Sequence, residues 1–247
     1  MDRLALPAVL LGLGVILLAL WLEGGQLASL LNGPALLIVV GGSLVATLAQ
    51  CPWGRFQRWL TLCRWLASPP RQDLDGLSDN LQFWSQQCRN QGLLALEEVS
   101  DDYPDPFVRK GLQLLVDGAP PEQLRDLLES DLYLQQDGDY KAADIFQMMG
   151  GYAPTMGILG AVLGLIQAMG QLTNPEALGS GIATAFVATI YGVAFANLIF
   201  LPLGGRLHAI IDARSRYQEA AIVGLMSLGL GEHPAKVAMK LQSYQDH

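Results

Sequence analysis

The sequence predicts an all-α membrane protein with four transmembrane helices and a helical cytoplasmic domain between the second and third of them. Three observations lead to this prediction. The chain has 247 residues, of which 51% are hydrophobic and only 15% are charged, and its mean hydropathy is +0.30. That composition is more apolar than is typical of a soluble protein. Four long spans carry no charge, and the basic residues near their ends fall on one side of the predicted membrane.

Each of the four uncharged spans is long enough for one helix, because a bilayer core of about 30 Å requires roughly 20 helical residues. The spans lie between Arg3 and Glu23, from Gly24 to Gly54, from Ile145 to Pro175, and from Ala177 to Gly205. The helices predicted within them cover residues 4–22, 34–51, 148–170 and 179–202. The first span resembles a signal peptide in length, but a second hydrophobic span follows it closely. We therefore expect a retained transmembrane helix.

The distribution of Lys and Arg predicts the orientation, because basic residues concentrate in cytoplasmic loops. Basic residues flank the cytoplasmic ends of the second, third and fourth spans: Arg55, Arg58, Arg64, Arg71, Lys141, Arg206, Arg214 and Arg216. The connections Gln26–Gly33 and Gln171–Leu178 contain no basic residue. Both termini should therefore be cytoplasmic. The expected division is helices 1 and 2 in 1–51, a cytoplasmic domain in 52–143, helices 3 and 4 in 144–204, and a cytoplasmic tail in 205–247.

The cytoplasmic segment should be helical. Apolar residues recur at helical spacing at Leu74, Leu77, Leu81, Trp84 and Cys88. The stretch "DPFVRKGLQLLVDG" predicts a helix that begins after Asp105 and stops at Gly118. The stretch "PPEQLRDLLESDL" predicts another, with four leucines on one face: Leu124, Leu127, Leu128 and Leu132. In the C-terminal segment, glycines are expected to interrupt a helical extension at Gly224, Gly229 and Gly231.

Small residues form a stripe on each of the last two transmembrane helices. The third helix has Gly157, Gly160, Ala161, Gly164 and Ala168 on one face, and the fourth has Gly181, Ala185, Ala188, Gly192 and Ala196. Helices in lipid associate through close packing, which small residues permit. Two interpretations follow. The stripes either join the two helices as a simple antiparallel pair, or they line a central cavity in an oligomer where a partner's helix lies.

Pro154 and Pro202 occupy corresponding depths near the cytoplasmic ends of these two helices. Proline removes a backbone hydrogen bond and can kink a helix. Each proline either marks a helix end or acts as a hinge.

The predicted spans contain no Asp, Glu, Lys, Arg or His in their cores. An ion pathway usually has an ionisable group there. If the protein conducts ions, another chain must supply the carboxylate.

Several function classes are disfavoured. A net charge of −8 argues against nucleic-acid binding. The cysteines, Cys51, Cys63 and Cys88, and the histidines, His208, His233 and His247, show no metal-ligand spacing, so we expect neither a metal site nor a cofactor. No constellation of nucleophile, base and oxyanion donors points to an enzyme.

Five motifs in order resemble the A-type stator subunit of the bacterial flagellar motor, the MotA/PomA group of the MotA/TolQ/ExbB superfamily. They are "LIVVGGSL", "GLLALEE", "DPFVRKGLQLLVDG", "YAPTMGILGAVLGLI" and "GIATAFVATIYGVAFANLIFLPL". The resemblance covers nearly the whole chain. It implies a multi-pass protein of the bacterial inner membrane, in which five A subunits surround two B subunits of the MotB/PomB kind. The B helix supplies the ion-binding Asp. In this family, ion flow rotates the A ring, whose cytoplasmic domain drives the rotor protein FliG.

The resemblance also assigns roles to individual residues. Arg109 and Asp117, with Lys110 as a neighbour, correspond to the charges that contact the rotor, although such charges are more often a solvated helix face. Pro154 and Pro202 correspond to the prolines that couple ion movement to shape change. The resemblance favours the cavity interpretation, with small residues that pack around the partner at Gly157, Gly160, Gly164, Ala185, Ala188 and Gly192.

Two positions bear on the transported ion. Sodium-driven relatives carry Thr where this chain has Ala161, and also at the position of Thr189. A hydroxyl can replace water around Na⁺, whereas a methyl group cannot, so Ala161 favours protons. Thr189 alone does not decide, because Thr also packs well between membrane helices.

Two alternatives remain open. One is an energy transducer of the TolQ/ExbB kind, although those proteins usually have three spans and an external N-terminus. The other is a non-conducting membrane scaffold, which would not need paired small-residue faces with prolines at matching depth.

Overall fold

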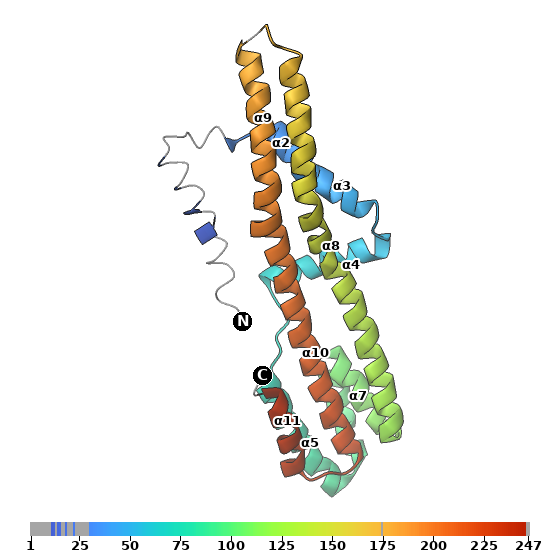
Figure 1. Cartoon of the computed structure of the whole chain (residues 1–247). Coiled ribbons are helices and arrows are strands. Elements are labelled where there is room, and N and C mark those ends of the chain that lie inside the picture. Colours follow the sequence, from blue (N-terminus) through green and yellow to red (C-terminus); the bar gives the residue numbers. More distant parts are fainter. Residues whose placement is uncertain are drawn as a thin grey trace. The chain divides into compact units, whose positions relative to one another are not determined.

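The computed structural model describes residues 30–173 and 175–245, together with Leu11, Gly12, Gly14, Val15, Leu18 and Leu22. The first predicted helix, residues 4–22, therefore lies mostly outside the described residues. Every regular element in the described part of the chain is helical (Figure 1). The chain divides into two compact units. The first comprises Met1–Ala67 and Tyr140–His208, and the second comprises Ser68–Asp139 and Ala209–His247.

The second predicted transmembrane helix is present in the first unit. It consists of α2 (Gly33–Leu36), a π-helical segment (Leu37–Gly41) and α3 (Gly42–Leu48), which follow one another without a break. Asn32 caps its start, because the side-chain oxygen of Asn32 accepts a hydrogen bond from the Ala35 amide at 3.0 Å. After a short turn comes α4 (Trp53–Ala67).

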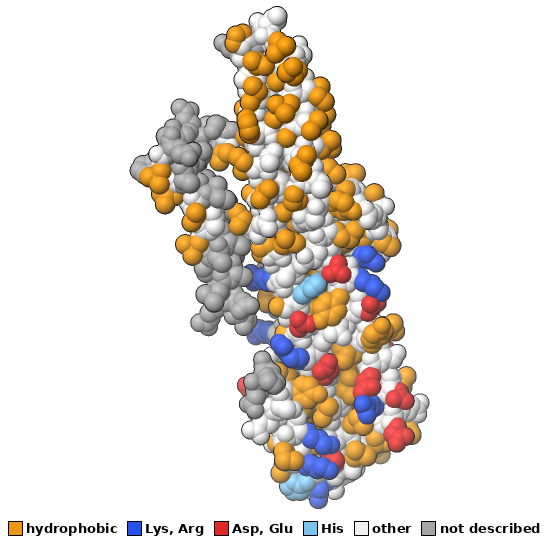
Figure 2. Space-filling model, viewed as in Figure 1, with side chains coloured by type: hydrophobic (Ala, Val, Ile, Leu, Met, Phe, Trp, Pro, Cys, Tyr) orange, Lys and Arg blue, Asp and Glu red, His pale blue; other side chains and the backbone are white. Residues whose placement is uncertain are grey.

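The third and fourth predicted helices form an antiparallel pair in the first unit (Figure 1). Helix α8 (Pro121–Met169) is followed by α9 (Pro175–Ala194), a π-helical segment (Phe195–Phe200) and α10 (Leu201–Gly229). Within the described residues, these two continuous helices are the ones long and apolar enough to cross a membrane, while Gly33–Leu48 is apolar but shorter. On the visible face of Figure 2, the part of the molecule where α8 runs beside α9 shows hydrophobic side chains and no charged ones.

Both long helices extend well beyond the ends predicted from the uncharged spans. Helix α8 begins 27 residues before position 148, and α10 ends 27 residues after position 202. The loss of charge marks the apolar part of a helix but does not mark its end, because polar residues such as Gln, Asp and Arg are also compatible with helix. A helix that starts or stops in water needs a cap or a breaker, and Pro121 supplies such a start.

The second unit is built from short helices packed on the polar parts of α8 and α10. These helices are α5 (Leu74–Gln91), a 3₁₀ turn (Leu93–Leu96), α6 (Glu97–Asp102), α7 (Pro106–Val116) and α11 (Pro234–Gln245). The predicted boundaries of α7 are confirmed. The Asp105 carboxylate accepts from the amides of Phe107 and Val108 at 2.8 and 3.2 Å, and Gly118 adopts φ +76° just after the helix.

Large apolar side chains fill the core of the second unit, most of them leucine. The predicted faces of α5 and α8 are largely confirmed, since Leu77, Leu81 and Trp84 are buried, as are three of the four predicted leucines on α8. Leu127 differs and is 40% exposed. Helix α10 also differs, because Gly224 does not interrupt it. A Cβ at Gly224 would overlap the Leu81 side chain, so the role of this glycine is to leave space for Leu81 of α5 to pack against α10.

Candidate functional site

Helices α8 and α9 approach each other closely enough for their backbones to touch. A Cβ at Gly157 would lie 2.9 Å from the Ala188 carbonyl oxygen, and one at Gly164 would lie 2.8 Å from the Ala185 amide nitrogen. From the other helix, a Cβ at Gly192 would lie 2.7 Å from the Ala153 carbonyl oxygen. Only glycine fits these positions without displacing a backbone, which explains why this pair is built from residues that favour helices poorly in water.

The six small residues predicted to surround a partner therefore lie between α8 and α9 of one chain. Gly160 belongs with them, because its Cβ would meet the Ala188 methyl group at 2.8 Å. This geometry matches the first of the two interpretations, the antiparallel pair. A contact with a partner helix stays a prediction, and the faces left for it carry large apolar side chains. These exposed side chains are Ile158, Leu159, Val162, Leu163, Leu165 and Ile166 on α8, and Phe186, Ile190 and Val193 on α9.

The two positions predicted to bear on ion choice lie outside the tightest part of the contact. Ala161 is half-buried and Thr189 is exposed. The Thr189 hydroxyl donates to the Ala185 carbonyl of its own helix at 3.2 Å. Such a bond satisfies a hydroxyl in an apolar environment without a partner from another helix. No ligand role for Thr189 follows from this contact.

Sequence reasoning missed two hydrogen bonds that join the residues at the start of α2 to α9. The Asn32 side-chain amide donates to the Thr184 hydroxyl at 2.8 Å, and the Tyr191 hydroxyl donates to the Leu30 carbonyl. The N-cap pattern Asn-Gly-Pro could have placed Asn32 at a helix start, but it gives no sign of a partner 152 residues away in the sequence.

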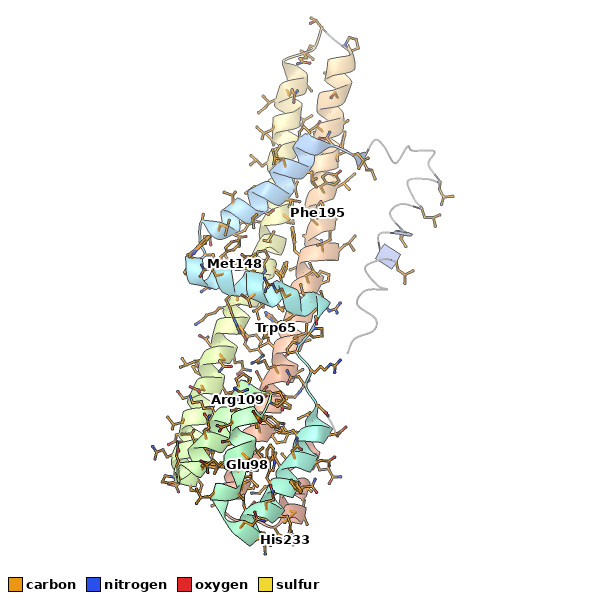
Figure 3. The ribbon with its side chains drawn as sticks, turned by 180° about the vertical axis from the view of Figure 1, so that it is seen from behind. Trp65, Glu98, Arg109, Met148, Phe195 and His233 are labelled. Carbon is orange, nitrogen blue, oxygen red and sulfur yellow. The ribbon has the colours of Figure 1, made fainter. Side chains whose placement is uncertain are left out.

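Both predicted coupling prolines lie inside continuous helices, so neither marks a helix end. Pro154 lies within α8. Pro202 is the second residue of α10, and α10 directly follows the π-helical segment Phe195–Phe200. Proline cannot donate the usual backbone hydrogen bond. A π-helical segment shifts the hydrogen-bond register and so accommodates a proline within an unbroken helix. Phe195, which begins this segment, is labelled in Figure 3.

Where the uncharged part of α8 begins, Asp144 contacts His208 of α10, a contact that sequence reasoning also missed. His208 Nε2 lies 3.1 Å from Asp144 Oδ1, and the His208 ring packs edge-to-face on Tyr140 with 5.3 Å between ring centroids. Asp144 is the last charged residue before the third uncharged span. A single His and a single Asp, 64 positions apart, carry no spacing signal that could have predicted this pair.

The predicted rotor-contact residues lie on α7 in the second unit. Arg109 is half-buried, and its Nε and one terminal nitrogen donate to the Tyr103 carbonyl at 3.0 and 2.7 Å. Tyr103 in turn packs edge-to-face on Trp84. Lys110 forms an ion pair with Asp131 on α8. The structure therefore brings Arg109, labelled in Figure 3, and Lys110 into contacts within the unit.

Asp117 lies at the opposite end of α7, where it is exposed. Together with Lys110 and Gln113 it forms the solvent-facing stripe of this helix, since residues seven apart share a face. A carboxylate at a helix C-terminus lies beside the negative end of the helix dipole, which is unfavourable by a few tenths of a kcal/mol. Stability of the helix therefore does not explain Asp117.

Within the described residues, no group of three or more His, Cys, Asp or Glu side chains could hold a metal ion.

The sequence is similar to known motility proteins over nearly its whole length. A model of the MotA/TolQ/ExbB proton channel family matches residues 99–220. Motility protein A of Bacillus subtilis is 32% identical over 99% of this chain and 91% of its own length. The chemotaxis protein PomA of Vibrio alginolyticus is 27% identical, with 99% and 95% covered.

The fold agrees with these similarities. A structure of C. jejuni MotAB matches with a TM-score of 0.91 at 25% identity and covers 99% of this chain and 96% of that one. The flagellar MotAB stator complex from Bacillus subtilis matches with a TM-score of 0.86 at 32% identity, with 98% and 94% covered. The all-α membrane fold predicted from the sequence is thereby confirmed. The paired apolar helices and the end-to-end likeness lead to one conclusion: the chain belongs to the motility protein A family, within the MotA/TolQ/ExbB proton channel family.

Proposed function

We propose that this protein is the A-type stator subunit of a bacterial flagellar motor, which with a B-type subunit converts ion flow into rotation. The observation that carries the proposal is the end-to-end likeness to motility protein A and to MotAB stator complexes. It spans both units, so the membrane helices and the second unit are accounted for together. A TolQ/ExbB-like transducer shares only the broader family.

The ion-binding carboxylate of the proposed complex belongs to the B-type subunit. No Asp, Glu, Lys, Arg or His occurs in Ile145–Pro175 or Ala177–Gly205, and an ion pathway through lipid normally contains such a residue. A homo-oligomer of this chain, a pentamer in the proposed complex, would surround the B helices. The exposed apolar faces of α8 and α9 supply the surface for both contacts, because the small-residue stripes are occupied within the chain.

Pro154 and Pro202 are the proposed coupling points between ion movement and shape change. Each leaves a carbonyl of the preceding turn without its usual donor. Since neither proline ends its helix, a bend at either one would be transmitted along a continuous rod toward the polar part of the same helix.

Lys110 and Asp117 are the proposed contacts with the rotor protein FliG, because they are exposed on one stripe of α7. Exposed charges add little stability but guide a transient partner. Arg109 acts by positioning the segment before α7, since its guanidinium holds the Tyr103 carbonyl. Its effect on torque would therefore be indirect.

We also propose a multi-pass protein of the bacterial inner membrane, with both termini and residues 52–143 in the cytoplasm. The arginines and lysines flanking the spans support this orientation. Reporter fusions after residues 28, 100 and 174 test it. Only the fusion after residue 100 should report a cytoplasmic location, and any other pattern contradicts the topology.

The proposed coupling ion is the proton, because Ala161 has no hydroxyl to replace water around Na⁺. Swimming supported by this protein should survive removal of sodium and stop when a proton uncoupler is added. Survival in the uncoupler with loss in sodium-free medium would overturn the proposal for the ion while leaving the stator function intact.

The decisive experiment measures swimming speed in a flagellated strain that lacks stators and is supplied with this chain and its candidate B subunit. The wild type should restore swimming, whereas Asp117→Lys, Arg109→Ala and Pro154→Ala should abolish or strongly reduce it. Asp126→Lys is the matched control, because Asp126 is an exposed carboxylate of the same unit on another helix. It should leave swimming nearly unchanged.

Failure of the wild type to restore swimming, despite a stable complex in the membrane, would point to a transducer or a scaffold. Loss of swimming in Asp126→Lys as well would mean that net charge matters rather than the α7 stripe.

A further inference from the structure

The concentration of basic residues on the cytoplasmic side accounts for the sign of the charges on helix α4 but not for what these charges contact. All three of its charged residues are arginines: Arg55, Arg58 and Arg64. The nearest acidic residues along the chain are Glu23 and Asp73, so residues 24–72 contain only positive charges, namely these three and Arg71. The whole chain has a net charge of −8. A purely basic segment in an acidic protein indicates a partner of negative charge.

The exposed side of α4 combines an apolar line with an arginine. Trp53, Leu60 and Ala67 are seven residues apart and so lie along one line of the helix. Trp53 is 68% exposed and Leu60 is 50% exposed. Arg64, four residues after Leu60, is exposed beside this line. Tryptophan and arginine side by side on an exposed helix face are typical of a helix at a membrane surface.

The opposite side of α4 fixes its depth. Leu62 is buried, and the Trp59 ring packs edge-to-face on Phe146 of α8 with 5.2 Å between centroids. Phe146 lies two residues after Asp144, where the uncharged part of α8 begins. Helix α4 runs across the direction of α8 rather than along it (Figures 1 and 3). It therefore lies at the level where charged residues give way to apolar ones, along the plane of the bilayer.

We propose that α4 binds the headgroups of anionic phospholipids in the leaflet at which it lies. The guanidinium groups match lipid phosphates, because arginine donates two parallel hydrogen bonds to such a group. Arg58 is held in place by stacking on Trp65, with 5.6 Å from its guanidinium carbon to the ring centroid. Arg55 and Arg64 have no carboxylate partner among the described residues. The line of Trp53 and Leu60 inserts beside the acyl chains.

The test uses the full chain in complex with its B-type partner in phosphatidylcholine bilayers. Spin-labelled phosphatidylglycerol and spin-labelled phosphatidylcholine are compared by the fraction of each lipid immobilised on the protein. The wild type should prefer phosphatidylglycerol, and the preference should fall at high salt. Arg58→Gln/Arg64→Gln should lose it, by roughly fivefold per arginine at the contact itself. The ratio of immobilised phosphatidylglycerol to immobilised phosphatidylcholine, averaged over all lipids around the protein, should also fall, but by a smaller factor.

The matched control is Arg89→Gln/Arg125→Gln, which removes the same charge from two exposed arginines on α5 and α8. It should keep the preference, and Arg64→Lys should keep most of it because the charge remains. Equal immobilisation of the two lipids by the wild type would overturn the proposal and indicate that another protein subunit covers α4. Equal loss in both double variants would overturn it as well. If the Arg58→Gln/Arg64→Gln complex does not assemble, the salt dependence of the wild type decides, and a preference that is insensitive to salt overturns the proposal.

Discussion

The two units of this protein hold their helices together in opposite ways. In the first unit, α8 and α9 meet backbone to backbone, and a Cβ at Gly181 would lie 2.9 Å from the Ala168 amide nitrogen. In the second unit, the helices are separated by a core of large side chains, including fully buried Leu81, Leu112 and Leu225. The same continuous helices, α8 and α10, contribute residues to both units.

The difference follows from the solvent each unit is built for. In water, burying a leucine removes apolar surface from the solvent and contributes about 1.5–3 kcal/mol. In lipid this gain is absent, because the acyl chains are as apolar as leucine, and close packing of backbones remains as the main attraction. The large apolar side chains of the first unit accordingly lie on its exposed faces, as with Ile158 at 60% and Phe186 at 67% exposed.

The largest effect should come from adding bulk between α8 and α9. Gly192→Val places a branched side chain where even a Cβ would lie 2.7 Å from the Ala153 carbonyl oxygen and 3.0 Å from the Gly157 Cα. Both obstacles are backbone, so the helices must separate, at a cost of about 3 kcal/mol or more. We expect loss of the assembled complex, measured by its yield after purification from the membrane, and loss of swimming.

Gly151→Ala is the control for this change. Gly151 lies in α8, the helix that packs against α9, but nothing is within 4 Å of its added Cβ. Alanine there should leave assembly intact and stabilise the helix by up to about 1 kcal/mol. If Gly151→Ala disrupts the complex as strongly as Gly192→Val, close backbone approach is not what holds the first unit together.

The second unit should respond most to the opposite change, the removal of bulk. Leu112→Ala takes a fully buried side chain out of the core and should lower the free energy of unfolding by about 2–5 kcal/mol. Thermal unfolding followed by circular dichroism measures the loss. Leu94→Ala is the control, because Leu94 is 69% exposed, and its effect should stay within about 0.5 kcal/mol.

The existence and buried faces of the helices were predictable, because both depend on local periodicity. Leu77, Leu81 and Trp84 of α5 are buried as their spacing predicts, and Asp105 caps α7 as its position before Pro106 predicts. The ends of α8 and α10 were not predictable from the uncharged spans. Charge marks where lipid ends, whereas helix ends depend on caps and breakers, and a helix passes from lipid into water without changing its backbone.

The candidate site was predictable as a set of positions but not as a set of contacts. Glycine spacing indicated a close-packed stripe, yet spacing cannot say whether the neighbour is α9 of the same chain or a helix of another. Arg109 was identified by its motif, but its hydrogen bonds to the Tyr103 carbonyl depend on how the chain folds back before α7. The Asp144–His208 pair joins residues with no shared motif.

A smaller effect is expected where proline interrupts the first unit's hydrogen bonding. Pro202→Ala restores a backbone donor next to the π-helical segment Phe195–Phe200. The free energy of unfolding should stay unchanged or rise by at most about 3 kcal/mol. Swimming speed should fall, because Phe195–Phe200 loses its alternative hydrogen-bond register. Parallel measurement of thermal stability and swimming separates the two effects. A variant that is destabilised and immotile would indicate a structural proline only.

The smallest effect on stability is expected in the turn between α10 and α11, where Glu232 forms ion pairs with two lysines. Lys236 and Lys240 each approach its carboxylate at 2.6 Å. Hydrogen bonds from Lys236 and then Lys240 lower the pKa of Glu232 from 4.5 to about 2. A carboxylate with a depressed pKa stabilises the folded state above its unfolded pKa and stops doing so as the pH falls through the folded value. Glu232→Gln should therefore cost about 1 kcal/mol at pH 7.

The pH dependence distinguishes this ion pair from simple loss of packing. The difference in melting temperature between the wild type and Glu232→Gln should be constant above about pH 4.5 and should shrink between pH 4.5 and pH 2, the window set by the two pKa values. Glu129→Gln is the control, because Glu129 pairs with Arg125 on an exposed helix face where both side chains are about half exposed. Its effect should be only a few tenths of a kcal/mol. A Glu232→Gln difference that persists unchanged to pH 2 would mean that the side chain stabilises the turn by shape, with its charge contributing nothing.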